Sequence, residues 1–206
     1  MIVNRERFEQ AVARFDAANA EDPNHDTMDG RQVAKELIYG QRVSEMLERF
    51  APEASEPLKL AARCQHIRRW TIPRSDYPQT TFGYKQWRAH LKKFHAETAG
   101  RILREVGYDE ATIKSVQSLL RKEALKVNAD TQTLEDVVDL VFLEYHLDDF
   151  VKKYSHYDEA KLADILRKTW KKMSPRGHEA ALKLIKLPEH LAPFVIKAVS
   201  GDTATA

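Results

Sequence analysis

The sequence predicts an all-α protein folded as a single domain. Apolar residues recur every three or four positions over most of the chain, and no segment shows the strict alternation of a half-buried strand. Only seven Gly and eight Pro occur among 206 residues, which argues against a linker or a disordered array. We expect one helical domain over residues 1–200 with a substantial core, followed by a disordered tail at 201–206.

The first half of the chain is expected to form four helices. The first, 5–19, has Phe8, Val12 and Phe15 at helical spacing. After a loop marked by Asp29 and Gly30, a second helix covers about 31–50 and is stopped by Pro52. A third is expected over about 55–70. An irregular loop with two prolines separates it from a fourth, about 84–106, which Gly107 ends.

The second half is expected to contain five helices, over about 109–125, 133–153, 158–173, 177–187 and 189–199. A turn over 128–132 precedes the second of them. Its segment Val137–Leu147 is apolar on nearly all sides, and a helix with that pattern is buried. We therefore expect it to be the central helix of the domain.

Composition narrows the functional classes. A net charge of +2 is too neutral for a dedicated duplex-binding protein. Cys64 is the only cysteine, so no intramolecular disulfide can form, and we expect a cytoplasmic protein with Cys64 as a small buried residue. No segment has the length and apolarity of a membrane span, so we expect no membrane association.

The segment Leu58–Pro78 is the densest in titratable, cationic and aromatic residues. Gln65 lies in line with the apolar side of the third expected helix, where an amide needs hydrogen-bond partners. It is either a group that orients a ligand or a core amide that braces the helix end. His66 follows it and is either a general base or metal ligand, or a cation at the helix C-terminus.

Four arginines in this segment could form an anion site, since a guanidinium group can bind two oxygens of a phosphate or sulfate at once. They are Arg63, Arg68, Arg69 and Arg74. The alternative is a solvated helix end. Trp70, Tyr77, Trp87 and Trp170 could stack on a planar ligand, although core packing is the simpler interpretation.

Three acids interrupt the apolar helix expected at 133–153, namely Asp136, Asp139 and Glu144. Buried acids are seldom unpaired, so their partners could be a metal ion or the arginine cluster. Asp136 has a second interpretation, because Thr133 three residues earlier fits a capping box. Glu144 is expected to form an ion pair with Arg or Lys. A basic run at 167–176 is either a solvated helix face or a surface for nucleic acid.

Several strings resemble an uncharacterised bacterial and fungal family known as domain of unknown function 4202. They are Glu36-Leu37-Ile38-Tyr39, Gln65-His66-Ile67-Arg68-Arg69-Trp70, Pro73-Arg74, Tyr77-Pro78, Gly83-Tyr84-Lys85-Gln86-Trp87-Arg88, Gln132-Thr133-Leu134-Glu135-Asp136, Val141-Phe142-Leu143-Glu144 and Lys168-Thr169-Trp170-Lys171-Lys172-Met173-Ser174. They span most of the chain. The family implies no activity.

A second, weaker resemblance is to the HD-domain superfamily of metal-dependent phosphohydrolases, which are helical bundles. Tyr39 stands where the first His of its motif would be, Gln65 and His66 stand for the His-Asp pair, and Asp136 matches the final Asp. The segment from His95 resembles the one that often supplies another His, and Arg121 and Lys122 replace the His residues of binuclear members. The resemblance implies an HD-like bundle whose pocket is formed by the helices that carry these residues.

The altered motif predicts that no binuclear metal centre forms, because Tyr, Gln, Arg and Lys are poor ligands for transition metals. We expect an anionic small molecule, bearing phosphate or sulfate, to bind near Tyr39, Arg42, Gln65, His66, Arg69, Trp70, Arg74, Tyr77, His95, Lys122 and Glu144. No cofactor is expected. One alternative is a phosphohydrolase-type enzyme that uses His66 and Asp136 with one divalent metal ion, and the other is an RNA-binding accessory protein.

Overall fold

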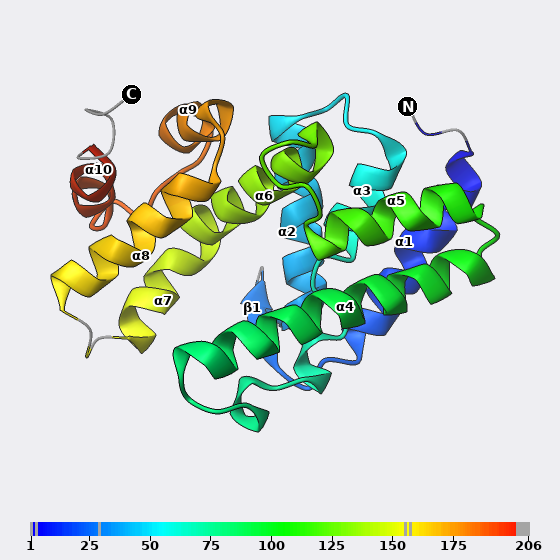
Figure 1. Cartoon of the computed structure of the whole chain (residues 1–206), viewed down its shortest axis with the longest axis horizontal. Coiled ribbons are helices and arrows are strands. Elements are labelled where there is room, and N and C mark those ends of the chain that lie inside the picture. The colour runs from blue at the N-terminus through cyan, green and yellow to red at the C-terminus, as the bar shows by residue number, and fades with distance from the viewer. Residues whose placement is uncertain (1, 3, 29, 155, 157, 201–206) are drawn as a thin grey trace. The chain divides into compact units, whose positions relative to one another are not determined.

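The fold was analysed in a computed structural model, which describes every residue except 1, 3, 29, 155, 157 and 201–206. The described residues form ten α-helices and one two-stranded sheet (Figure 1), so the all-α prediction is confirmed. The helices are α1 (Arg5–Ala20), α2 (Lys35–Phe50), α3 (Glu56–Arg63), α4 (Thr81–Glu105), α5 (Glu110–Arg121), α6 (Ala129–Val141), α7 (Leu147–Lys153), α8 (Glu159–Lys172), α9 (Pro175–Lys183) and α10 (Ala192–Ser200). None of these helices is long and apolar enough to cross a membrane.

The chain divides into two compact units, Met1–Leu134 and Glu135–Ala206. In the first, α4 lies beside α5, α5 packs on α3, and α3 packs on α2. In the second, α8 packs on α10. The expected single domain over 1–200 stays a prediction, and the tail expected to be disordered, 201–206, lies outside the described residues.

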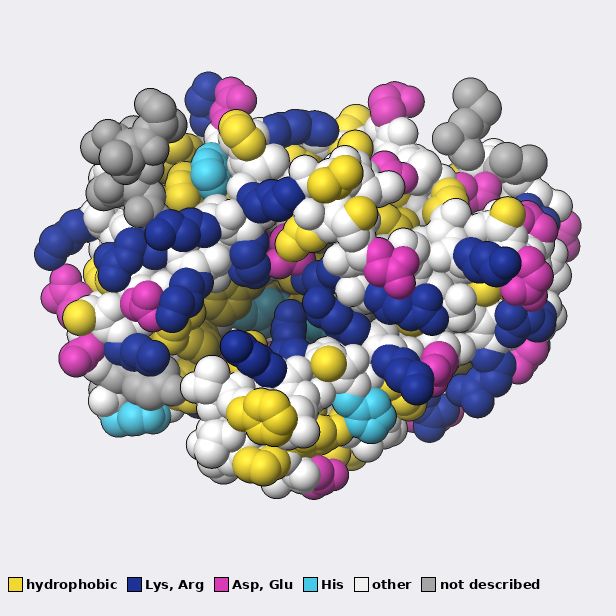
Figure 2. Space-filling view, viewed as in Figure 1, with side chains coloured by type: hydrophobic (Ala, Val, Ile, Leu, Met, Phe, Trp, Pro, Cys, Tyr) yellow, Lys and Arg dark blue, Asp and Glu magenta, His cyan; other side chains and the backbone are white. Residues whose placement is uncertain are grey.

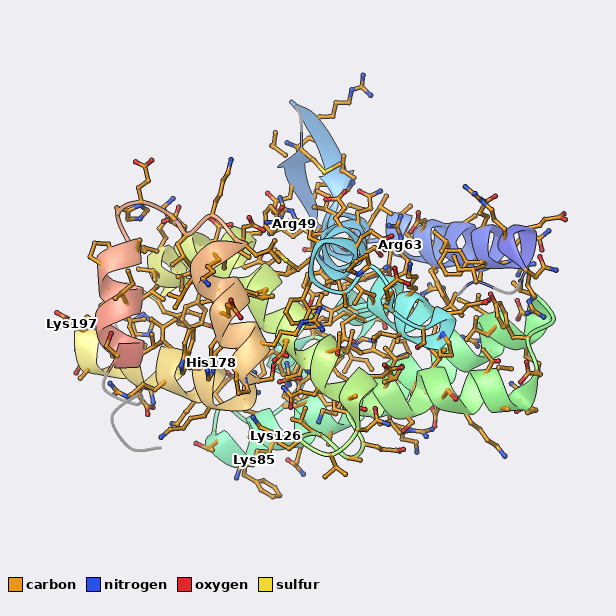
Figure 3. All side chains as sticks on the ribbon, turned by 90° about the horizontal axis from the view of Figure 1, so that it is seen from above. Arg49, Arg63, Lys85, Lys126, His178 and Lys197 are labelled. Atoms are coloured by element: carbon orange, nitrogen blue, oxygen red, sulfur yellow. The ribbon has the colours of Figure 1, made fainter. Side chains whose placement is uncertain are left out.

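A β-hairpin precedes α2, where the sequence predicted the start of a helix. Strands β1 (His25–Met28) and β2 (Arg31–Ala34) pair antiparallel, with Met28 opposite Arg31. Gly30 has φ +76°, a value that suits the tight turn of a hairpin. Figure 3 shows the hairpin projecting from the helices. Four of its eight strand residues are exposed and only Ala34 is buried, and the two strands lack the apolar alternation that marks a half-buried strand.

Helix α3 ends at Arg63, seven residues before the predicted end. Cys64 begins a series of turns, and Arg68 adopts φ 52°, which no helix residue can have. The backbone N–H of Arg68 donates to the buried side chain of Asn19, at 3.0 Å. The short 3₁₀ segments η1 (Arg69–Thr71) and η2 (Arg74–Asp76) follow. The hydrogen bond from Asn19 on α1 thus stabilises a left-handed turn at Arg68. The apolar pattern of residues 55–70 does not predict this turn.

Helices α4 and α5 begin and end on local signals. Thr80 accepts the N–H of Gly83 and Asp109 accepts that of Thr112, each as an N-cap. Gly107, after α4, has φ +89°, as expected for a glycine that stops a helix. Lys122, after α5, is left-handed at φ 59°.

The long helix expected at 133–153 begins four residues earlier and contains an irregularity. The side chain of Asn128 caps α6 by accepting the N–H of Thr131, at 2.9 Å. The Thr133 capping box is therefore wrong, because Thr133 lies inside the helix. A π-helical turn, η3 (Phe142–His146), joins α6 to α7. Most of the predicted central segment is buried, with Val137, Leu140, Val141, Leu143 and Leu147 each at most 2% exposed.

Candidate functional site

The candidate site lies in the N-terminal unit, where α2, the turns after α3, and α4 meet. Gly40 allows α2 to approach the end of α3 closely, since a Cβ at residue 40 would lie 2.7 Å from the carbonyl oxygen of Arg63. The preceding residue, Tyr39, stacks its ring on that of His66, with centroids 4.0 Å apart and planes 9° apart. His95 of α4 lies beside His66, with ring centroids 5.9 Å apart.

Each histidine of this pair has a partner at Nδ1. His95 Nδ1 lies 2.9 Å from the carbonyl oxygen of Ile67. A carbonyl only accepts, so Nδ1 carries the proton and Nε2 of neutral His95 is an acceptor. His66 Nδ1 lies 3.4 Å from Oε2 of Glu36. The interpretation of His66 as a helix C-terminal cation is therefore wrong, because α3 ends earlier and the ring packs between Tyr39 and His95.

Two buried acceptors, one on the turns after α3 and one on α4, have no hydrogen-bond partner among the described residues. They are Nε2 of His95 and Oε1 of Gln65. His95 is 4% exposed and Gln65 is 5% exposed. A buried acceptor without a donor costs free energy, so native structures seldom contain one that no ligand or water satisfies.

Three cations act on the pair. Burial, and next the charge of Arg69, hold the pKa of His66 well below its usual value, and Arg88 and Lys122 lower it further. The pKa of His95 is lowered to about 4, chiefly by burial, with Arg69 and Arg88 contributing. Both rings are therefore neutral at neutral pH.

Among the described residues, Glu36 provides the carboxyl group that contacts the histidine pair. Burial raises its pKa to about 7, against the opposing charge of Arg69. Within the described part of the chain, the guanidinium groups of Arg69 and Arg88 form no ion pair, and Arg69 lies over the ring of Trp87, 5.0 Å from its centroid. In Figure 2, Lys and Arg side chains gather over the face of the N-terminal unit that carries α4.

Sequence reasoning gave Glu36 and Arg88 no role. Arg88 could have been found, because it precedes the inward-facing His95 by seven residues, which is two helical turns. Glu36 gave a weaker signal. It precedes Tyr39 by three residues, so both lie on one side of α2.

Other predicted site residues have structural partners. The guanidinium of Arg74 donates to the carbonyl oxygens of Tyr77, Pro78 and Thr80, at 2.9, 2.8 and 3.4 Å. Tyr77 forms a hydrogen bond with His90. Trp70 is half-buried, with the Arg68 guanidinium 6.0 Å from its ring centroid, and Arg42 is half-buried on α2.

Asp136 and Glu144 belong to the C-terminal unit and bind backbone groups there. Both oxygens of Asp136 accept from Ser174, one from its N–H at 2.7 Å and the other from its hydroxyl at 2.5 Å. Oε1 of Glu144 accepts the N–H of Lys186 at 3.0 Å. Lys172 is the cation beside Asp139 and Glu135, at 2.8 and 3.0 Å.

No three His, Cys, Asp or Glu side chains are grouped to hold a metal ion among the residues that the structure describes. The expectation that no binuclear centre forms stays a prediction. Cys64 is fully buried, as expected, and donates to the carbonyl oxygen of Leu60 at 3.1 Å. Burial raises the pKa of its thiol.

The fold and the site define an all-helical protein with a neutral histidine pair beside two arginines that form no ion pair with a described carboxylate. The chain belongs to the family described as Domain of unknown function (DUF4202), which it matches over residues 9–195. No curated protein and no solved structure matches it. The resemblance to HD-domain phosphohydrolases is therefore not confirmed and stays a hypothesis.

Proposed function

We propose that this protein binds an anionic small molecule, bearing phosphate or sulfate, at the histidine pair of the N-terminal unit. The observation that carries the proposal is that Arg69 and Arg88 flank two neutral histidines without an ion pair to any described carboxylate. Half-buried cations of this kind raise the local potential and favour anion contacts. With Trp87 beneath it, Arg69 is also held in place.

The energetics suit a small anion. Each good charge-assisted hydrogen bond contributes about 1.5–3 kcal/mol. Two or three of them support an affinity between millimolar and micromolar. Lys122, which lowers the pKa of His66 from the end of α5, supplies further positive potential. Arg74 has no part in the revised site, because three backbone carbonyls already bind its guanidinium.

The test is the thermal shift that low-millimolar phosphate or sulfate produces in the wild type, Arg69→Gln and Arg88→Gln. An anion that binds only the folded protein raises its melting temperature. Lys85→Gln is the matched control, because Lys85 is exposed on α4 one turn before Arg88 and its substitution removes the same charge (Figure 3). We expect the shift in the wild type and in Lys85→Gln, and a smaller one in the other two variants.

A general salt effect must be separated from binding, since phosphate and sulfate stabilise most proteins at high concentration. That effect would raise all four melting temperatures alike. Equal shifts in all four proteins would therefore refute the proposed anion site.

No observation on the described residues favours the two alternative functions. The enzyme alternative needs Asp136 beside His66, and both oxygens of Asp136 are bound by Ser174. The RNA alternative needs free lysines on α8. Lys168 pairs with Asp164 at 2.6 Å, and Lys172 pairs with Glu135 and Asp139.

A further inference from the structure

The proposed site contains a hydrogen-bond acceptor as well as cations, which restricts the anion it can take. A fully ionised oxyanion such as sulfate offers only acceptors, which suit Arg69 and Arg88. It has nothing to donate to Nε2 of His95, which is buried and has no hydrogen-bond partner among the residues that the structure describes. Oε1 of Gln65, next to His66 in the chain, is a second buried acceptor in the same condition.

The backbone fixes the role of His95 Nε2. The carbonyl oxygen of Ile67 holds the proton on Nδ1, at 2.9 Å, so the neutral ring cannot turn its other nitrogen into a donor. His95 also packs against His66 and edge-on against Phe94, which leaves the ring little freedom to flip. Nε2 therefore presents a lone pair that only a donor satisfies.

We propose that the site selects an oxyanion that carries its own O–H group, hydrogen phosphate being the simplest, and that His95 Nε2 accepts this proton while Arg69 and Arg88 bind the charged oxygens. The inference rests on the proposed anion site. It adds a specificity-determining residue and narrows the ligand from phosphate or sulfate to the protonated oxyanion. A site built to accept a ligand O–H rejects the analogue that lacks it, because its own polar group stays unpaired.

The experiment compares phosphate with sulfate by isothermal titration calorimetry near pH 8. There phosphate is mostly HPO₄²⁻, which matches sulfate in charge and shape and differs by one O–H. We expect phosphate to bind the wild type at least about tenfold more tightly, since an unsatisfied buried acceptor costs that much or more. Arsenate, which is also protonated, should follow phosphate, and selenate should follow sulfate.

His95→Asn tests the assignment to this nitrogen. The Asn amide can still donate to the carbonyl oxygen of Ile67, but it places no acceptor where Nε2 stood. We expect the phosphate-to-sulfate affinity ratio to fall to near one. His25→Asn is the matched control, because His25 is exposed in β1 and its Nδ1 also contacts a carbonyl oxygen, that of Pro23, at 3.0 Å. Its ratio should equal that of the wild type.

The outcomes separate this inference from the proposed function. If wild type binds both anions equally, the inference is overturned and the anion site stands. If it binds neither, both fail. If phosphate is preferred but His95→Asn keeps the preference, His95 is not the selecting residue and the inference is wrong. Should His95→Asn not fold, the ¹⁵N shift of Nε2 in the wild type decides, since phosphate must move it and sulfate must leave it nearly unchanged.

Discussion

At the scale of single residues, the carboxyl group of Glu36 beside the histidine pair lowers the stability of the protein at neutral and alkaline pH. Its carboxyl group is buried, with 14% of the side chain exposed, and its pKa rises from an ordinary 4.5 to about 7. The folded state therefore holds this proton more tightly than the unfolded state between these two values. Stability is lost as the pH rises through that window, and the loss is complete above pH 7.

Glu36→Gln should remove this loss. Relative to wild type, the variant should gain up to about 3 kcal/mol of unfolding free energy near pH 8, and the gain should vanish near pH 4.5. The lowered pKa of His95, about 4, acts in both proteins and cancels in the difference. Urea denaturation in anion-free buffer from pH 4.5 to 8 measures this. A difference that does not change with pH would mean that Glu36 is not titrating in this window.

At the scale of elements, Asn19 joins three segments that build the site. From the end of α1 its side chain donates to the carbonyl oxygen of Glu36, at 3.3 Å, and accepts the N–H of Arg68, at 3.0 Å. The second bond holds the left-handed turn that leads into Arg69. Asn19 thus fixes both the start of α2 and the chain around His66.

Asn19→Ala should lower the unfolding free energy by about 2–3 kcal/mol, because two hydrogen bonds are lost and a buried N–H is left without a partner. It should also weaken phosphate binding, since Arg69 loses its fixed position. Asn19→Asp, which keeps the acceptor for Arg68, should retain more of both properties. Urea melts and calorimetry measure the two effects. Unchanged binding in a destabilised Asn19→Ala would separate the turn from the site.

Asp136 connects α6 to the start of α9. Besides its two bonds to Ser174, it packs against Gly177 so closely that a Cβ there would lie 2.8 Å from its Oδ1. Asp136→Ala should destabilise the protein by about 2–3 kcal/mol, whereas Asp136→Asn keeps the acceptor for the Ser174 N–H and should cost less. Neither should change the phosphate affinity measured by calorimetry. Loss of binding in folded Asp136→Ala would show that the anion site is placed wrongly.

The helices were predictable where local signals decide them, as with Gly107 after α4 and the apolar run of Val137–Leu147. Features that depend on contacts with residues distant in the sequence could not be predicted. The pattern of 55–70 suits a helix, but α3 ends at Arg63, and Asn19 binds the N–H of Arg68 in the left-handed turn that follows. The site was predictable in part for the same reason. His66, His95 and Arg69 stand out by residue type, whereas Arg74 looks like an anion ligand until its three carbonyl partners are known.

At the scale of the whole molecule, a net charge of +2 comes from nearly equal numbers of both signs, 33 basic and 31 acidic residues. What matters is therefore which charges are already paired. The basic run of α8 contains one ion pair that is exposed and one in which the carboxylates are buried. Lys168 meets Asp164 in an exposed i,i+4 pair, while Lys172 meets two carboxylates that are almost fully buried, Glu135 at 3% exposed and Asp139 at 6%.

These two lysines give a test of the nucleic-acid alternative. Lys172→Met removes an ammonium from between two buried carboxylates and should cost about 2–3 kcal/mol, somewhat less than a fully buried pair because Lys172 is itself 42% exposed. Lys168→Met should cost at most about 0.5 kcal/mol.

An RNA-binding surface predicts a different result, since both substitutions remove one positive charge and should reduce RNA affinity and its salt dependence alike. Urea denaturation and RNA titration at two salt concentrations measure both quantities. We expect unequal losses of stability and no salt-dependent RNA binding in the wild type, because Lys172 is already bound by two buried carboxylates and Lys168 is paired with Asp164. RNA affinity that falls with salt and drops equally in both variants would assign the surface of α8 to nucleic acid.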